Sequence, residues 1–379
     1  MEQFDIVLAA DPRFSGGTAS ALLADVEAFR ALGAKVGIFL VTSDFFQDAR
    51  EQPNHAVTSL GELDGVSLIA NGATVSAELA FFHHPLAFAH PTPERLNLTT
   101  KRAVLVAHHP AFRGDGSLEY NPLQVNRSIS ISFGIRPWWA PVSGLVRQQL
   151  RSFSPLLRMT NADWINLFDP GDWHPTRPIF DGPRPVVGRH SRPDRLKWPD
   201  TAQAIADSLS AGPDWDVRVM GWPHDGFPFE VPQSAAWDVL EFNAKPVPDF
   251  VNSIDVFAYH FSGLWVEAFG RTVMEAMLIE RPCLLDPRLE GTFGELATYC
   301  EPQNVRQHLE QLRADPKTTQ SAARATRAAV IDTYSSDAMA RRLEALKIDT
   351  GITSRYGPKT ASPSTTLRKA IGLARRNRR

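Results

Sequence analysis

Two glutamates flank a glycine in the segment 256–283. Glu267 follows a predicted strand, Gly270 opens a helix predicted over 270–280, and Glu275 falls on the second turn of that helix. Free N–H groups at a helix N-terminus bind anions such as a diphosphate, and a glycine there lets a ligand approach the backbone closely. One ionised carboxylate on each side could accept hydrogen bonds from the vicinal hydroxyls of two sugars. Two ordinary glutamates on a solvated helix face are the alternative.

Basic residues follow the first predicted strand of the second half. Arg189 leaves that strand, and Lys197 lies in the loop after it. A guanidinium fork and a compact ammonium suit a diphosphate leaving group, because they stabilise the negative charge that develops as a glycosidic bond breaks. Arg192 and Arg195 lie in the same loop and compete with Lys197 for this role. Surface bases without a ligand are the alternative.

The loop after the first predicted strand contains Gly16 and Gly17. Adjacent glycines allow an anion or an acceptor to approach the backbone closely, although a plain flexible turn explains them equally well. The loop lacks the G-x-G-x-x-G pattern, which weighs against a dinucleotide-dependent enzyme.

His-His-Pro occurs twice, at 83–85 and 108–110, each time after an apolar strand. A histidine there could act as a hydrogen-bond donor or as an acid or base near a reacting sugar. Four clustered histidines could instead bind zinc, but their local spacing matches no zinc motif. For His83 and His84, loop histidines with satisfied hydrogen bonds are the favoured interpretation. The D-x-D at 214–216 is interpreted as turn acids before a strand rather than as a metal site.

The hydrophobic pattern predicts two α/β series, and therefore two doubly wound parallel sheets. In the first half, strands are predicted at 4–10, 35–41, 66–69, 79–82, 103–107 and 164–168, with a helix at 18–32. In the second half, strands are predicted within 185–191 and at 216–221, 239–242, 255–260 and 282–285, with helices at 200–211, 249–253, 270–280, 305–313 and 318–346. Two such sheets are expected to face a cleft, with ligands at the carboxyl ends of the strands.

The length of 379 residues fits two domains. We predict an N-terminal Rossmann-like domain at 1–168, a Pro/Gly-rich linker at 169–185, a C-terminal Rossmann-like domain at 186–346 and a basic, largely disordered tail at 347–379. The tail holds nine Lys/Arg against one acid, Asp349. Within 366–379 one helical face is apolar and the opposite face is basic, so this helix could lie on an anionic membrane. A disordered, solubilising end is the alternative.

The composition excludes several classes of protein. With 43% hydrophobic and 22% charged residues the chain is globular rather than disordered, and it contains no apolar stretch long enough to cross a membrane. The start lacks the features of a secretory signal, and two cysteines make no disulfide framework, so a cytoplasmic location is expected. The body before the tail is acidic, which argues against nucleic acid as a partner.

The segment around the two glutamates resembles the E-x7-E signature of retaining GT-B glycosyltransferases, especially those of family four. The family pattern E-x-F-G, four residues, E-A-M and then Gly-Pro is matched by Glu267-Ala268-Phe269-Gly270, Glu275-Ala276-Met277 and Arg281-Pro282, with Arg281 in place of the usual glycine. The resemblance extends over roughly residues 4–345. It implies a GT-B fold in which the C-terminal domain binds a nucleotide sugar and the N-terminal domain binds the acceptor.

The resemblance also implies roles for single residues. Glu267 would bind the donor sugar ring and Glu275 the nucleotide ribose, while the backbone of Phe269, Gly270, Arg271 and Thr272 would border the donor. The family loop G-R-x-x-x-x-K-G matches Arg189 and Lys197, with a longer gap and Trp198 in place of the last glycine. Its Gly-rich first loop matches Gly16 and Gly17. Its histidine, often in H-x-P, selects His108, with His109 as the alternate.

The function expected from the resemblance is retaining, metal-independent transfer of a hexose-type sugar from a nucleotide sugar to a glycan or lipid-linked acceptor. Glu267, His108, Arg189 and Lys197 would be catalytic, and no cofactor is expected. Assembly of surface polysaccharide is the expected process, with the tail as an attachment to the inner face of the plasma membrane. A GT-B sugar-nucleotide epimerase, a phosphorylase, or an inactive nucleotide-sugar-binding protein are the alternatives.

Overall fold

The computed structural model describes residues 1–46, 52–154, 156–209, 214–224, 226–349 and 362–376. The chain divides into two compact units, each built on its own parallel sheet. The first unit comprises residues 1–168 together with 336–379, and the second comprises residues 169–335.

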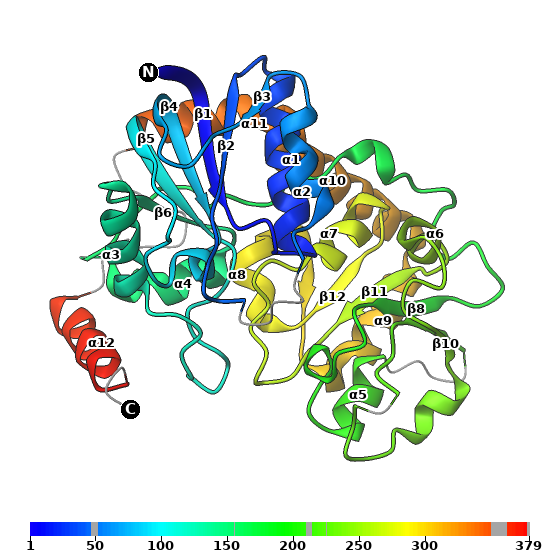
Figure 1. Ribbon diagram of the computed structural model, residues 1–379. Coiled ribbons are helices and arrows are strands. Elements are labelled where there is room, and N and C mark those ends of the chain that lie inside the picture. The colour runs from blue at the N-terminus through cyan, green and yellow to red at the C-terminus, as the bar shows by residue number, and fades with distance from the viewer. Residues whose placement is uncertain (47–51, 155, 210–213, 225, 350–361, 377–379) are drawn as a thin grey trace. The chain divides into compact units, whose positions relative to one another are not determined.

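Seven parallel strands form the sheet of the first unit, in the order β3-β2-β1-β4-β5-β6-β7 (Figure 1). The strands are β1 (Glu2–Ala10), β2 (Val36–Leu40), β3 (Val66–Leu68), β4 (Thr74–His83), β5 (Asn97–Ala107), β6 (Trp138–Pro141) and β7 (Arg158–Met159). The strand order reverses between β1 and β4. In open α/β sheets ligands bind outside the carboxyl ends of the strands at such a reversal.

The helix after β1 shows how the sequence builds this unit. α1 (Gly17–Ala31) buries Leu22, Val26 and Phe29, which recur at helical spacing, and it lies beside β2. The other helices are α2 (His55–Thr58), α3 (Pro122–Phe133), α4 (Gly144–Leu150), α11 (Met339–Ile348) and α12 (Pro363–Arg376), with 3₁₀ turns η1 (Ser59–Glu62), η2 (Pro85–Phe88), η3 (Arg151–Phe153) and η10 (Ser336–Ala338).

Six parallel strands form the sheet of the second unit, in the order β10-β9-β8-β11-β12-β13. They are β8 (Val186–His190), β9 (Asp216–Met220), β10 (Asp238–Leu240), β11 (Val256–Tyr259), β12 (Cys283–Leu285) and β13 (Thr298–Tyr299). The order reverses between β8 and β11, so the residues that leave these two strands occupy the favoured ligand position of this unit.

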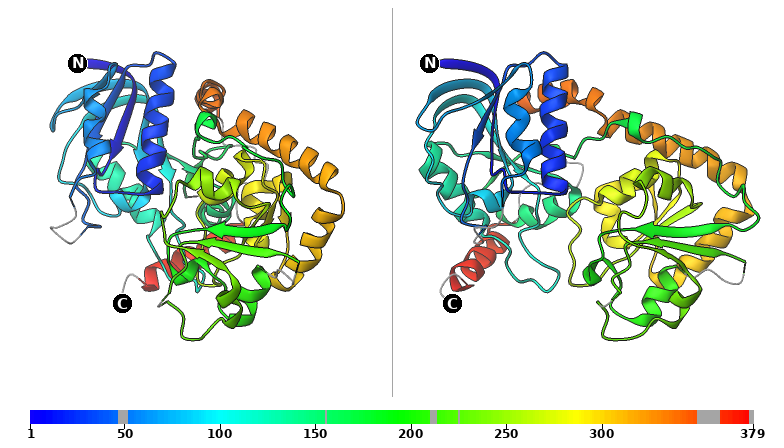
Figure 2. Two further views of the ribbon diagram at one scale, coloured as in Figure 1. Left: turned by 90° about the vertical axis from the view of Figure 1, so that its right-hand side faces the viewer. Right: turned by 45° about the vertical axis from the view of Figure 1, so that its right-hand side comes forward.

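The second unit also contains helices, and Figure 2 shows the longest of them, α10, in orange. They are α5 (Ala202–Ser208), α6 (Val247–Asn252), α7 (Arg271–Leu278), α8 (Glu290–Phe293), α9 (Val305–Ala314) and α10 (Pro316–Tyr334), with 3₁₀ turns η4 (Pro170–Asp172), η5 (Arg195–Lys197), η6 (Pro232–Ala236), η7 (Pro287–Leu289), η8 (Gly294–Leu296) and η9 (Pro302–Asn304). In the core, Trp198 packs edge-on against Trp222 with ring centroids 4.7 Å apart.

The segment predicted as a linker, 169–185, groups with the second unit. Buried Asp255 holds it there: its carboxylate pairs with Arg177 at 2.7 Å and accepts hydrogen bonds from the backbone N–H groups of Phe180 and Val186. Residues from Ser336 onward group with the first unit, whereas the sequence prediction placed residues up to 346 in the second domain. The predicted disorder at 350–361 lies outside the described residues.

Two local predictions differ from the structure. The apolar run at 164–168 forms no strand: only its last residue, Phe168, makes an isolated bridge, while the indole of Trp164 donates a hydrogen bond to buried Asp25. The helix predicted over 318–346 is interrupted because buried Ser335 is extended (φ −78°, ψ 164°), which ends α10 before α11 begins. No helix formed by the described residues is both long and apolar enough to cross a membrane.

Candidate functional site

Glu267 lies at the centre of a buried polar cluster in the second unit. It follows β11, and its Oε2 accepts hydrogen bonds from three different side chains. The donors are Lys197 Nζ at 2.5 Å, Tyr259 Oη at 2.7 Å and Trp265 Nε1 at 3.2 Å. The Lys197 ammonium also lies 4.3 Å from the centroid of the Trp265 ring.

These contacts set the charge of Glu267. Burial by itself raises the pKa of this carboxyl, but the Lys197 charge and the three hydrogen bonds outweigh it, so the pKa of Glu267 lies below its ordinary value. The carboxylate is therefore ionised at neutral pH. Its Oε1 accepts no hydrogen bond from the described residues, so it is available to a hydroxyl of a ligand.

Arg189, on β8, is fully buried and bonded to the protein itself. Its Nη1 donates to the carbonyl of His260 at 2.8 Å and its Nη2 to the carbonyl of Lys197 at 2.6 Å. The guanidinium also stacks on Trp198 and Tyr259, at 3.9 and 4.6 Å from their centroids. Burial lowers the pKa of Arg189 to about 10, which leaves it charged at neutral pH. Arg189 thus holds the backbone at Lys197 and at His260, just after β11. Direct contact with a diphosphate stays a prediction.

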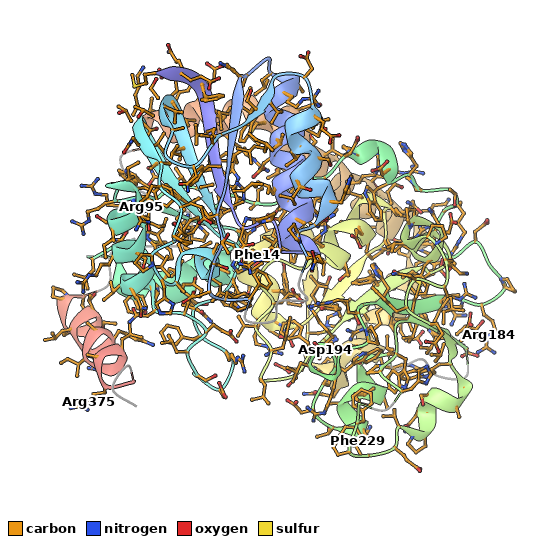
Figure 3. All side chains as sticks on the ribbon, in the orientation of Figure 1. Phe14, Arg95, Arg184, Asp194, Phe229 and Arg375 are labelled. Carbon is orange, nitrogen blue, oxygen red and sulfur yellow. The ribbon has the colours of Figure 1, made fainter. Side chains whose placement is uncertain are left out.

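The three candidate bases in the loop after β8 differ in how deeply they are buried. The carboxylate of Asp194, labelled in Figure 3, accepts the backbone N–H of Leu196 at 2.9 Å and so caps the short turn η5. At the end of that turn Lys197 is buried against Glu267, whereas Arg192 is exposed and Arg195 is half-buried.

Gly270 begins α7 in a left-handed conformation with φ +90°. An added Cβ would also lie 3.3 Å from the ring of Phe293, so both conformation and space favour glycine. On the second turn of α7, buried Glu275 lies with its Oε2 3.2 Å from Nε2 of His190. The adjacent β8 residues Arg189 and His190 therefore contact the surroundings of both glutamates, which places Glu267 and Glu275 at the same strand end.

Two hydroxyl groups close to these residues have no internal partner. Ser191 Oγ, which follows β8, and Thr272 Oγ1, in the first turn of α7, are buried without a hydrogen bond to the described residues. Buried hydroxyls are normally hydrogen-bonded. Ser191 follows His190 in the chain, and Thr272 lies three residues before Glu275, so the two hydroxyls indicate a polar ligand or water at this strand end.

Arg288 and Asp286 support the loop that carries Glu267. Arg288 pairs with Asp286 at 2.6 Å and donates hydrogen bonds to the carbonyls of Phe261 and Ser262, at 2.8 and 3.0 Å. This network fixes the segment between β11 and Glu267.

In the first unit, the predicted glycines lie at the carboxyl end of β1. Gly16 caps α1 with φ +59°, and Gly17 is the first residue of the helix; both are exposed. An added Cβ at Gly16 would meet no atom within 4 Å, so the positive φ rather than crowding requires glycine there. Their backbone is open to a ligand.

The four histidines of the two His-His-Pro triplets gather at the ends of β4 and β5. His83 Nδ1 lies 3.1 Å from His108 Nε2, and the ring of His84 stacks on Phe14 at 4.1 Å. His109 lies 3.6 Å from Glu119. Burial lowers the pKa of His108 to about 3 and the pKa of His83 well below its ordinary value, so both rings are neutral.

A metal site was the alternative for these histidines. Within the described ranges, no group of three or more His, Cys, Asp or Glu residues is arranged to hold a metal ion. In the D-x-D segment, Asp216 begins β9 and pairs with exposed Arg184 at 2.9 Å.

The sequence did not identify Tyr259, Trp265 and His190 as site residues. Tyr259 and His190 end strands β11 and β8, at the reversal of the sheet, so their positions alone could have indicated them. Trp265 carries no such signal, because its role depends on the course of the loop before Glu267.

No family model and no curated protein matches the sequence. Solved structures do match in shape. A glycosyltransferase from Rickettsia africae ESF-5 matches with a TM-score of 0.61 at 13% identity, over 91% of this chain and 97% of that one. Anabaena Alr3699/HepE in complex with UDP and glucose matches with a TM-score of 0.57 at 14% identity, over 90% and 98%.

The chain has the GT-B fold. The lipopolysaccharide outer core galactosyltransferase WaaB, in its apo form, also matches, with a TM-score of 0.55 at 10% identity, over 88% of this chain and 96% of that one. The predicted fold class, two Rossmann-like parallel-sheet domains of the GT-B type, is thereby confirmed.

Proposed function

We propose that this protein is a glycosyltransferase that moves a sugar from a nucleotide-sugar donor to a glycan or lipid-linked acceptor. The observation that carries the proposal is the burial of Glu267 and Glu275 at one strand end, on either side of the N-terminus of α7. Similar structures support the donor class, since HepE has the same fold and was solved with UDP and glucose.

The geometry supports different roles for Glu267 and Glu275. Glu267 is ionised with Oε1 available, so it accepts a hydrogen bond from a hydroxyl of the donor sugar. Glu275 accepts hydrogen bonds from the nucleotide ribose, and its Oε2 lies 3.2 Å from His190 Nε2. The backbone from Phe269 to Thr272 borders the donor, and the unpartnered hydroxyl of Thr272 is a further polar contact.

The reaction proposed is dissociation of the nucleoside diphosphate followed by attack of the acceptor on the same face of the sugar, with retention and without a metal. Lys197 and the N–H groups that open α7 stabilise the diphosphate. Arg189 supports them from its buried position, and its charge adds to the positive potential. In the first unit, His108 and the Gly16-Gly17 loop serve the donor sugar and the acceptor.

The last helix supports a role at a membrane surface, as expected for assembly of surface polysaccharide. α12 buries Leu373 but exposes Leu367 (62%) and Ile371 (45%). Arg368 and Arg375 are exposed on the same helix, and α12 contains no acidic residue. Each basic residue near an anionic bilayer contributes about 1 kcal/mol, so this pair would strengthen binding roughly 30-fold.

The test is a turnover assay with UDP-glucose, GDP-mannose and dTDP-glucose, each with and without a glycan or lipid-linked acceptor. The expected result is acceptor-dependent release of nucleoside diphosphate from one donor, with the anomeric configuration of the product retained in its proton NMR spectrum. Isomerised donor without transfer would identify an epimerase instead. Phosphate-dependent cleavage would identify a phosphorylase, and tight binding without turnover a binding protein.

A further inference from the structure

A chain of buried polar groups runs from α1 to the end of β5 in the first unit. Asp25 on α1 and His83 at the end of β4 are both almost fully buried, and His83 is followed by His108 after β5. The Asp25 Oδ2 to His83 Nε2 distance is 3.9 Å, and His83 Nδ1 lies 3.1 Å from His108 Nε2. The pairing of β4 with β5 brings the two histidines together, because His83 lies opposite Val106.

The short contact between two ring nitrogens restricts the position of the protons. One nitrogen must carry a hydrogen and the other a lone pair. If His83 donated from Nδ1, its Nε2 would be a bare lone pair facing Asp25 Oδ2. That nitrogen has no hydrogen-bond partner among the described residues, so nothing there would donate to it.

The carboxyl group of Asp25 determines whether His83 Nδ1 or His108 Nε2 carries the hydrogen. Its Oδ2 accepts a hydrogen bond from the indole of Trp164 at 2.9 Å, so this oxygen presents lone pairs towards His83. This holds for the ionised carboxylate, which can only accept hydrogen bonds. Burial raises the pKa of Asp25 to about 7, so the assignment applies above that pH. A lone pair on Asp25 Oδ2 favours N–H at His83 Nε2, which leaves His83 Nδ1 as an acceptor and makes His108 Nε2 the donor.

We propose that Asp25 and His83 are positioning residues that hold His108 as its Nε2–H tautomer, with Nδ1 bare. Nδ1 of His108 makes no hydrogen bond to the described residues and is not among the buried unpartnered atoms. It can therefore only accept, which matches a hydroxyl of the donor sugar or of the acceptor. This last step rests on the proposed function, whereas the tautomer itself does not.

Other charged groups around the array do not change this assignment. Arg342, on α11, donates to the carbonyl of Ile165 and acts on Asp25 only at longer range. On the far side, His84 accepts the N–H of Leu86 through its own Nδ1, and His109 pairs with Glu119.

The direct test is long-range nitrogen–proton NMR correlation on the full-length protein with 15N-labelled histidine, at pH 8.5, where Asp25 is ionised. His108→Gln identifies the signals of His108. The expected result is a neutral His108 with its proton on Nε2. A protonated Nδ1, or a doubly protonated ring, would overturn the inference whether or not the protein turns over a nucleotide sugar.

Matched variants separate positioning from packing. Asp25→Asn places an amide oxygen where Oδ2 accepts from Trp164, so His108 should keep its Nε2–H tautomer. Asp25→Leu removes that acceptor, so both tautomers of His108 should be populated. His83→Asn should keep an acceptor near the position of Nδ1, whereas His83→Phe should not. We expect kcat/KM with the donor found in the turnover assay to fall about tenfold in the Leu and Phe variants and about twofold in the Asn variants. Equal losses in all four, with the tautomer unchanged, would overturn the inference, while a chain without turnover would refute only the proposed function.

Discussion

Replacing Lys197 by Met should destabilise the second unit in a pH-dependent way. The Lys197–Glu267 pair is buried, with 11% and 10% of the two side chains exposed, and its atoms are 2.5 Å apart. Removing one partner of a buried pair costs about 3–5 kcal/mol, because the other charge stays buried. Tyr259 and Trp265 still donate to Glu267, so we expect the lower end, about 3 kcal/mol at pH 7.

The sign of the pH dependence follows from the pKa of Glu267. In the wild type this pKa lies below its ordinary value of 4.5, so the pair stabilises the fold above pH 4.5 and the stabilisation is lost as the pH falls through the lower, folded-state pKa. Without Lys197, burial dominates and raises the pKa of Glu267 above 4.5. The variant should therefore be most destabilised at neutral pH and should approach the wild type near pH 4.

Thermal unfolding followed by circular dichroism between pH 4 and pH 8 measures this effect. A loss of about 3 kcal/mol should lower the melting temperature of a domain of this size by about 6–12 °C at pH 7. Lys101→Met is the matched control, because the Lys101–Glu78 pair is exposed (76% and 42%) and worth about 1 kcal/mol or less. Equal shifts in the two variants, or a shift independent of pH, would refute the reasoning.

Three further perturbations test other parts of the account. Tyr259→Phe removes one donor to Glu267 while keeping the ring, so kcat/KM should fall about tenfold with an unchanged circular dichroism spectrum; full activity would contradict the role given to this hydroxyl. Gly270→Ala should cost about 1–2 kcal/mol in urea unfolding because of its φ of +90°, whereas Gly372→Ala, on α12 with nothing within 4 Å, should cost nothing; equal effects would argue against the left-handed cap. Leu367→Ser with Ile371→Ser should weaken co-sedimentation with phosphatidylglycerol vesicles at least tenfold, and unchanged binding would exclude this face of α12 from membrane contact.

The fold could be predicted from the sequence because buried parallel strands appear as continuous apolar runs. The runs at 4–10 and 103–107 are continuous and apolar, and the helix at 18–32 has regular spacing, so local pattern and final structure agree. The break at Ser335 could not be predicted in this way. The apolar residues on both sides keep helical spacing, and the Ser335-Ser336-Asp337 segment between them contains neither Gly nor Pro. In the structure Ser335 is buried and extended, which ends the helix there.

The candidate site was predictable only where its residues carry a pattern of their own. Glu267 and Glu275 have a characteristic spacing around Gly270, so the sequence identifies them. Tyr259 and His190 are ordinary strand residues, and their importance depends on which strands become neighbours. The same holds for His83 and His108, whose contact requires the pairing of β4 with β5.

The interior position of Arg189 could not be predicted either. An arginine after a strand suggests a ligand contact, yet in the structure both Nη atoms are bonded to backbone carbonyls and the guanidinium is stacked between two aromatic rings. These bonds depend on loops that are far apart in the sequence. A basic residue can thus belong to a site by holding its loops in place.

The central claim is that Glu275 and the start of α7 bind a nucleotide sugar. Titration calorimetry of wild type, Glu275→Ala and Glu295→Ala against UDP-glucose, GDP-mannose and dTDP-glucose tests it most directly, since Glu295 is an exposed glutamate of the same unit. We predict that one donor binds the wild type and the Glu295 variant equally, and that Glu275→Ala weakens its binding about 100-fold without unfolding the chain. Equal donor binding by all three proteins, or no binding of any donor to the wild type, would contradict the claim.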